Sequence, residues 1–183
     1  KPLDTLSQYR EVFTFPIEDY YKRVGFDFDK IPFSMLAHEY MEDYQEKSYA
    51  CDLHSDVLDV VNKAKNLGFS QTVLSASKMD YLLKQMETLH VDDLFDSIYG
   101  INDIYAKSKV ELAHAFKQTC SLDDEIYFVG DSVHDYEVAK NIGAKCILVT
   151  TGHQNRATLE SVNVPVMDSL MESLDLIYER DKD

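Results

Sequence analysis

Short apolar runs alternate with longer amphipathic segments along most of the chain from about residue 50 onward. The runs are rich in β-branched and aromatic residues, whereas the segments between them repeat apolar residues every three or four positions, which is the period of a helix packed on one face. This alternation is typical of a parallel α/β sheet. The predicted strands are 71–75, 97–100, 125–130, 145–150 and 165–167, and the clearest helices are 56–67 and 110–119. We expect the five strands to form one parallel sheet.

Residues 1–50 follow a different pattern, because they contain no convincing buried strand and carry aromatic residues at helical intervals. Thr5 followed by Gln8 fits a capping box, and Pro16 and Pro32 stand where helices can begin. We therefore predict a small lobe of two or three helices at residues 1–50 and an α/β core at residues 51–183. The aromatic residues are interpreted as packing within the lobe; they are Tyr9, Phe13, Tyr20, Tyr21, Phe33, Tyr40 and Tyr44.

The strongest chemical motif is a hydrophobic strand that ends in Gly130-Asp131 and is followed by Asp135 four residues later. Ligands of open α/β sheets bind beyond the carboxyl ends of the strands, where Asp131 is expected. A carboxylate in that place suits Mg²⁺, which prefers oxygen ligands. Asp131 is therefore the candidate metal ligand. Asp135 is expected to orient a lysine or a metal-bound water, or else simply to favour the dipole of the following helix.

A second apolar strand ends at Ser75-Ala76-Ser77. The hydroxyl of Ser75 and the backbone N–H groups that follow it, beginning with Ala76, can hold a phosphoryl oxygen. Ser77 is interpreted as the N-cap of the next helix, which should run to Leu89. The third candidate, Lys109, directly precedes an amphipathic helix and is preferred to Lys107, because its ammonium group could offset charge on phosphoryl oxygens and carboxylates.

The order of Ser75, Lys109 and Gly130-Asp131 with Asp135 resembles motifs two, three and four of the haloacid dehalogenase (HAD) superfamily. The resemblance covers essentially the whole chain and is closest to the phosphoglycolate-phosphatase-like branch, in which a helical cap follows the first strand. It implies a Rossmann-like α/β core with a helical cap lobe at the N-terminus, and Mg²⁺ as the cofactor.

The first motif of that superfamily, DxDx[TV], supplies a nucleophilic aspartate at the end of a strand. The candidate DxD of this sequence, Asp27-Phe28-Asp29, lacks an apolar strand before it and is followed by Ile31 and Pro32. We interpret Asp27 and Asp29 as part of a loop between cap helices. The core would then lack its first strand, and the nucleophile is expected upstream of Lys1.

The resemblance implies a Mg²⁺-dependent phosphatase that hydrolyses a small phosphorylated metabolite through an aspartyl-phosphate. The 183-residue chain itself is expected to bind phosphate weakly and to turn over little. Two alternatives stay open: a complete minimal enzyme that uses Asp27 and Asp29, and a non-catalytic α/β binding module. The implied roles are catalysis for Ser75, Lys109 and Asp135, substrate binding for Ser75, Ala76 and Lys109, and metal binding for Asp131.

Composition limits the classes of partner that the protein is expected to bind. The net charge is −15, with 28% charged residues and no basic patch, so nucleic acid and anionic membrane surfaces would be repelled. No apolar run is long enough to span a bilayer, and the three cysteines lack the spacing of a zinc or redox site. We expect a cytoplasmic protein whose partner is a small metabolite, and the sequence indicates no oligomeric state.

Overall fold

A computed structural model describes residues 3–101 and 108–182, which form strands and helices in alternation after an all-helical start. No helix in these ranges has the length and apolar character needed to cross a membrane. The helices are α1 (Leu6–Val12), α2 (Ile17–Arg23), α3 (Phe33–Ser48), α4 (Val57–Asn66), α5 (Met79–Thr88), a 3-10 turn η1 (Asp92–Leu94), α6 (Lys109–Lys117), α7 (Val133–Asn141), α8 (Arg156–Glu160) and α9 (Leu170–Arg180), and the strands are β1 (Thr72–Lys78), β2 (Ser97–Ile101), β3 (Tyr127–Gly130), β4 (Lys145–Val149) and β5 (Val166–Met167).

Every strand pair of the described residues is parallel, as the alternation of strands and helices predicts. The fold is a Rossmann-like α/β fold. The expectation of one five-stranded sheet is wrong, however, because the strands form two sheets, β1-β2 and β3-β4-β5. Sequence patterning identifies strands but not their neighbours, and it could not indicate that β1 and β3 would remain unpaired with each other.

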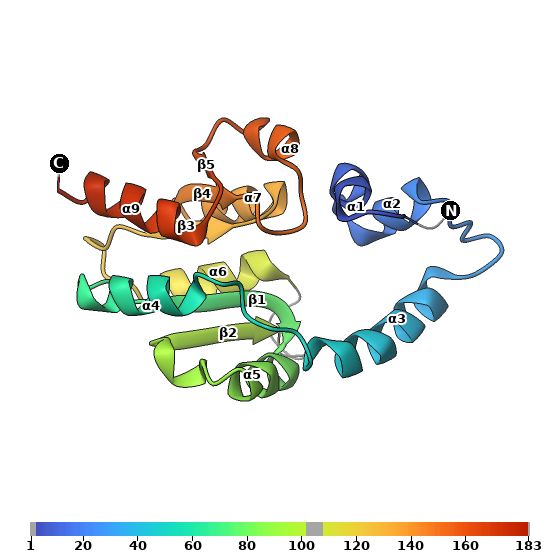
Figure 1. Ribbon diagram of the computed structural model, residues 1–183, viewed down its shortest axis with the longest axis horizontal. Helices are drawn as coiled ribbons and strands as arrows, with labels where there is room; N and C mark the ends of the chain where they lie inside the picture. Colours follow the sequence, from blue (N-terminus) through green and yellow to red (C-terminus); the bar gives the residue numbers. More distant parts are fainter. Residues whose placement is uncertain (1–2, 102–107, 183) are drawn as a thin grey trace.

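A groove of about 570 Å³ lies along the facing parts of β1 and β3. In the described residues β1 pairs with β2 alone and β3 with β4 alone, so each has a free edge. Leu74 of β1 and Phe128 of β3 nevertheless pack on the same buried cluster from α6 and α7, formed by Ala113, Val138 and Ile142. Helices thus connect the two sheets where backbone hydrogen bonds do not (Figure 1).

Strand β1 contains an irregularity at the predicted site. Regular pairing with β2 ends at Leu74 and resumes only at Lys78, and the Ser75 hydroxyl accepts a hydrogen bond from the Ser77 N–H at 3.1 Å. Ser77 therefore belongs to β1, and its interpretation as a helix N-cap is wrong. Helix α5 begins two residues later at Met79, without a side-chain cap. The bulge keeps the chain extended past the end of the apolar run, so β1 continues through Ser77 where a helix was predicted to begin.

Several helix ends follow their sequence signals. Gly68 and Gly143 have φ values of +88° and +70° just after α4 and α7, the left-handed conformation expected of a helix C-cap. Pro16 and Pro32 are the N-cap residues of α2 and α3. The Thr5 side chain accepts a hydrogen bond from the Gln8 N–H at the start of α1, but the Gln8 side chain accepts from the Asp4 N–H instead of the Thr5 N–H, so only half of the predicted capping box forms. These local rules hold because they depend only on neighbouring residues.

The N-terminal helices form an aromatic cluster, as the spacing of their rings predicts. Tyr9 lies 5.3 Å from Phe13 and 5.8 Å from Tyr20 between ring centroids, and Phe13 is buried. Figure 1 shows α1 and α2 beside the part of the core that carries α7 and α8, and α3 running back toward β1, β2 and α5. We refer to α1–α3 as the helical lobe. Its aromatic cluster lies next to the carboxyl end of β3.

Candidate active site

The carboxyl end of β3 is followed directly by the N-terminus of α7. Ser132 is the N-cap: its hydroxyl accepts from the Asp135 N–H, and the Asp135 carboxylate accepts from the Ser132 N–H at 3.1 Å, which completes a capping box. Both side chains are buried. The pattern Ser-x-x-Asp is visible in the sequence, although sequence reasoning did not use Ser132. The capping box fixes where Asp131, the residue before it, leaves the strand.

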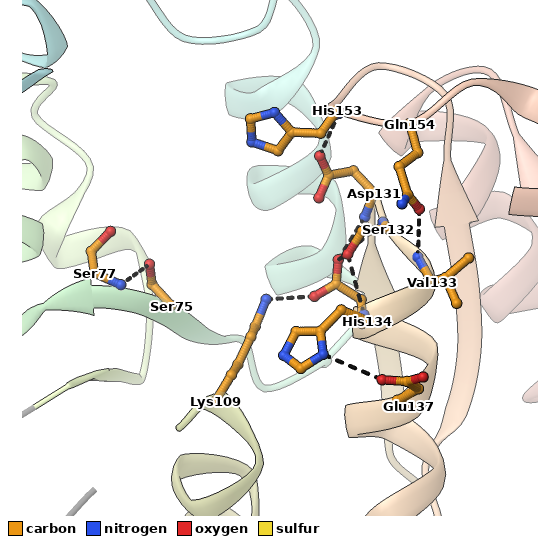
Figure 2. A network of polar contacts seen from close by, with 11 residues as sticks. Ser75, Ser77, Lys109, Asp131, Ser132, Val133, His134, Glu137, His153 and Gln154 are labelled. Carbon is orange, nitrogen blue, oxygen red and sulfur yellow. Dashed lines mark hydrogen bonds and ion pairs between the residues drawn. The ribbon is translucent and has the colours of Figure 1, made fainter. Parts of the chain in front are cut away.

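Asp135 bridges Lys109 to this turn. Its Oδ1 lies 2.5 Å from Lys109 Nζ, and its Oδ2 accepts hydrogen bonds from the Asp131 N–H, the Ser132 N–H and the Ser132 hydroxyl (Figure 2). The Asp135 side chain is 3% exposed and that of Lys109 is 18% exposed. Asp135 thus orients a lysine, one of the two tasks considered for it, and fixes the ammonium group near the end of β3.

Burial and the hydrogen-bonding partners of Asp135 have opposite effects on the pKa of its carboxyl group. Burial alone would raise the pKa of this carboxyl, but the nearby Lys109 charge, the Lys109 and Ser132 hydrogen bonds and the Asp131 N–H together hold the pKa below its ordinary value of 3.8. Both carboxylate oxygens of Asp135 accept hydrogen bonds, which favours the charged form because neither oxygen then carries a proton. Asp135 is therefore ionised at neutral pH.

The lowered pKa predicts how the stability of the fold changes with pH. A carboxyl group whose folded pKa lies below its unfolded value contributes its full stabilisation above the unfolded pKa and loses it as pH falls through the folded pKa. We expect the free energy of unfolding of the protein to exceed that of Asp135→Asn by a constant amount from pH 7 to about pH 5 and by less below pH 3.8. Urea unfolding of both proteins across this range measures the difference. A difference that grows on acidification would contradict the assignment.

Asp131 is held by the loop that follows β4. The His153 N–H donates to Asp131 Oδ2 at 2.7 Å, and the Gln154 side chain accepts from the Val133 N–H at 2.7 Å. A Cβ atom on Gly152 would lie 1.8 Å from Asp131 Oδ2, so the carboxylate rests against the loop backbone and this position needs glycine. Sequence reasoning missed the loop, although a glycine placed three residues after a buried strand was a usable signal.

The other predicted site residues, Ser75 and Ala76, lie on β1 in the other sheet. Ser75 is partly buried in the bulge of β1, and Ala76 beside it is exposed. Figure 2 shows Ser75 on one side, Asp131 on the other and Lys109 between them. Lys107 lies outside the described residues. The structure therefore joins Lys109, Asp131 and Asp135 in one hydrogen-bonded network and places Ser75 across from it.

Asp27 and Asp29 form contacts with each other and with Lys30. They occupy the turn between α2 and α3, as their interpretation as a loop predicts. Asp27 forms an exposed ion pair with Lys30 at 2.8 Å and accepts a hydrogen bond from the Asp29 N–H. Those hydrogen bonds lower the pKa of Asp27. No strand precedes the pair in the described residues, so neither carboxylate stands at the rigid strand end that a nucleophile requires.

The oxygen ligands available at the site are few but of the type that Mg²⁺ prefers. Asp131 Oδ2 is engaged by His153, whereas the described residues give Oδ1 no partner. No group of three histidine, cysteine or acidic side chains converges on one point in that part of the chain. One carboxylate fits Mg²⁺, because this ion commonly takes one or two protein carboxylates and completes its shell with water and phosphate oxygens. Asp131 can therefore hold the ion, and tight binding requires further oxygen ligands.

Comparison with known proteins identifies the family of the chain. Residues 4–149 match the model of the haloacid dehalogenase-like hydrolase family. No curated protein matches the sequence. Among solved structures, a haloacid dehalogenase-like family hydrolase from Streptococcus pneumoniae superposes with a TM-score of 0.81 at 20% identity, over 97% of this chain and 83% of that one.

Two further structures carry phosphatase names. A predicted phosphatase from Clostridium acetobutylicum gives a TM-score of 0.77 at 20% identity, over 97% of this chain and 83% of that one. A predicted phosphoglycolate phosphatase from Haemophilus somnus gives 0.65 at 16% identity, over 94% and 80%. At these identities the likeness concerns the fold alone. The family match over most of the sequence shows that the chain belongs to the haloacid dehalogenase-like hydrolases.

Proposed function

We propose that the protein is a Mg²⁺-dependent phosphate monoester hydrolase. The observation that carries this proposal is the network of Lys109, Asp135 and Asp131 at the carboxyl end of β3. It places a cation and a carboxylate, one oxygen of which has no partner among the described residues, at the sheet end where α/β proteins bind their ligands. A cation beside a metal-binding carboxylate suits a substrate with a dianionic phosphoryl group.

Each residue of the site has a separate task in this proposal. Lys109 binds a phosphoryl oxygen and offsets the charge that develops during transfer, while Asp135 holds its ammonium group in place. Ser75 and the N–H of Ala76 bind a second oxygen from the side of β1. Asp131 holds Mg²⁺, which when bound would neutralise the phosphoryl oxygens.

The nucleophile is proposed to be an aspartate on an extended segment N-terminal to Lys1. The support is the groove between β1 and β3, which is lined from both sides by strand residues such as Leu74 and Phe128 and reaches Lys109 at one end. A parallel strand in that groove could pair with both free edges and end between Ser75 and Asp131. Attack on the phosphorus atom by its carboxylate would break the ester P–O bond, release the alcohol and form an aspartyl-phosphate. Water would then hydrolyse this intermediate to aspartate and inorganic phosphate.

The substrate is proposed to be a small phosphorylated metabolite. The helical lobe brings Tyr9 and Phe13 next to His153, which contacts Asp131 through its backbone. Any group attached to a phosphate bound at Asp131 would therefore meet aromatic side chains. The phosphatase names of two solved structures with this fold agree with the proposal.

The test compares the 183-residue chain with a chain extended at its N-terminus by the proposed segment, a strand that ends in the DxDx[TV] motif. Hydrolysis of an aryl phosphate is measured with Mg²⁺ and with excess chelator. We expect Mg²⁺-dependent turnover from the extended chain and at most a trace from the shorter one. If the 183-residue chain hydrolyses the aryl phosphate as fast as the extended chain does, the proposal of a nucleophile upstream of Lys1 is wrong. If the extended chain is inactive, the phosphatase assignment is wrong.

A further inference from the structure

The backbone at Gly152-His153 is held from two opposite sides. The carbonyl oxygen of Gly152 accepts a hydrogen bond from Arg10 Nε at 2.8 Å, and the N–H of His153 donates to Asp131 Oδ2 at 2.7 Å. These two groups belong to the same peptide unit. The helical lobe therefore binds the C=O of a peptide unit whose N–H binds Asp131, the candidate metal ligand.

Peptide planarity makes this connection rigid. The C=O and N–H of a trans peptide point in opposite directions in one plane, and rotation about the C–N bond is strongly hindered. Fixing the direction of the Gly152 carbonyl therefore fixes the direction of the His153 N–H. A hydrogen bond to the carbonyl also polarises the peptide unit and strengthens its N–H as a donor.

Arg10 is well suited to this task, because it engages two successive carbonyl groups. Its Nη2 donates to the Thr151 carbonyl at 2.9 Å in addition to the bond from Nε to Gly152. The flat guanidinium group presents several donors in a fixed fork, whereas a lysine ammonium is a single point of charge on a flexible stem. Two points of contact set the orientation of the loop, and one would set only its position.

The lobe is attached to the same loop by neighbouring contacts. The Tyr9 hydroxyl lies 2.7 Å from His153 Nδ1, and the Phe13 ring stacks on the His153 ring with centroids 4.7 Å apart at an interplanar angle of 20°. Asn155 Nδ2 donates to the Arg10 carbonyl at 3.5 Å. Helix α1 and the loop after β4 are thus joined by these contacts as well as by the Arg10 side chain.

We propose that Arg10 is a positioning residue, which orients the Gly152-His153 peptide so that it holds Asp131 Oδ2 and leaves Oδ1 directed to the metal. Docking of the helical lobe then forms part of the metal site. This consequence for the metal rests on the proposed function, whereas the coupling between Arg10 and Asp131 does not.

The coupling is tested in the metal-free 183-residue chain by residue-resolved amide hydrogen exchange. We expect Arg10→Met to accelerate exchange of the His153 amide by about tenfold or more, because the donor loses its fixed direction toward Asp131. Arg10→Lys should give a smaller effect, since it restores one contact. Arg23→Met, in which an exposed arginine of α2 is replaced with the same loss of charge, should leave the His153 amide unchanged.

The fully buried Ile147 of β4 reports on global opening in the same spectra. Unchanged exchange at His153 in Arg10→Met overturns the proposal, and so does an equal acceleration at His153 and Ile147. Tyr9→Phe, which removes only the hydroxyl contact with the ring, serves as a milder variant that preserves the fold. It should accelerate His153 exchange less than Arg10→Met does, and the reverse order would assign the positioning role to Tyr9.

The consequence for the metal is tested with the extended chain. Arg10→Met should raise the Mg²⁺ concentration that gives half-maximal hydrolysis by about tenfold and change kcat at saturating Mg²⁺ by less than about threefold. An unchanged Mg²⁺ requirement overturns this consequence. If the extended chain hydrolyses nothing, the phosphatase assignment has failed, and the exchange experiment alone decides the role of Arg10.

Discussion

Replacing Asp131 by asparagine in the extended chain is expected to lower kcat/KM for an aryl phosphate by about a thousandfold, which corresponds to about 4 kcal/mol of transition-state stabilisation. An amide oxygen can still accept the His153 N–H, so the loop should keep its position. The negative charge at the metal is lost, and with it the ion that would neutralise the phosphoryl oxygens. Steady-state kinetics at several Mg²⁺ concentrations measure the effect.

Asp27→Asn is the matched control, because it makes the same chemical change in an exposed turn of the helical lobe. We expect kcat/KM of this variant to stay within about twofold of the unmodified extended chain. Should Asp27→Asn abolish hydrolysis while the fold survives, the enzyme uses Asp27 as its nucleophile, and the minimal-enzyme alternative is correct.

Replacing Lys109 by methionine is expected to lower the free energy of unfolding by about 3 kcal/mol. Methionine keeps most of the apolar stem but leaves the Asp135 carboxylate buried without its cation. The three hydrogen bonds that Asp135 accepts from Asp131 and Ser132 remain and limit the loss. Urea unfolding at neutral pH measures the change.

Two further variants show whether the effect comes from the buried charge. Lys84→Met breaks an exposed pair with Glu87, 3.7 Å apart, and should cost about 0–1 kcal/mol. Lys109→Met combined with Asp135→Asn should be more stable than Lys109→Met alone, because the second change removes the unpaired charge. A double variant that is less stable than the single one would show that Asp135 does not depend on Lys109.

The sequence predicts the elements of the fold well and their assembly poorly. Strand and helix positions follow from local periodicity, and the helix ends at Gly68 and Gly143 follow from the conformational freedom of glycine. The division into two sheets depends on which strands become neighbours. That choice is made by long-range packing, such as the contact of Leu74 and Phe128 with one helix cluster, and no local pattern encodes it.

The site shows the same division between local and distant information. Asp131 and Asp135 stand out because they follow a strand that is recognisable in the sequence, and the Ser132 capping box lies within the same five residues. Arg10 is more than 140 residues away from the loop it contacts, so its two hydrogen bonds could not be predicted. Ser77 was misplaced because the bulge of β1 extends the strand beyond its apolar residues.

In the 183-residue chain, β1 and β3 each have a free edge among the described residues, which also affects how copies of this chain behave toward one another. An unpaired strand edge is a template on which any extended polypeptide can add hydrogen bonds, and such edges are a common origin of aggregation. The chain opposes this tendency with its net charge of −15, which makes copies repel one another over about 10 Å at moderate salt. The colloidal stability of the protein therefore depends on its acidic surface, and screening of that surface removes the protection.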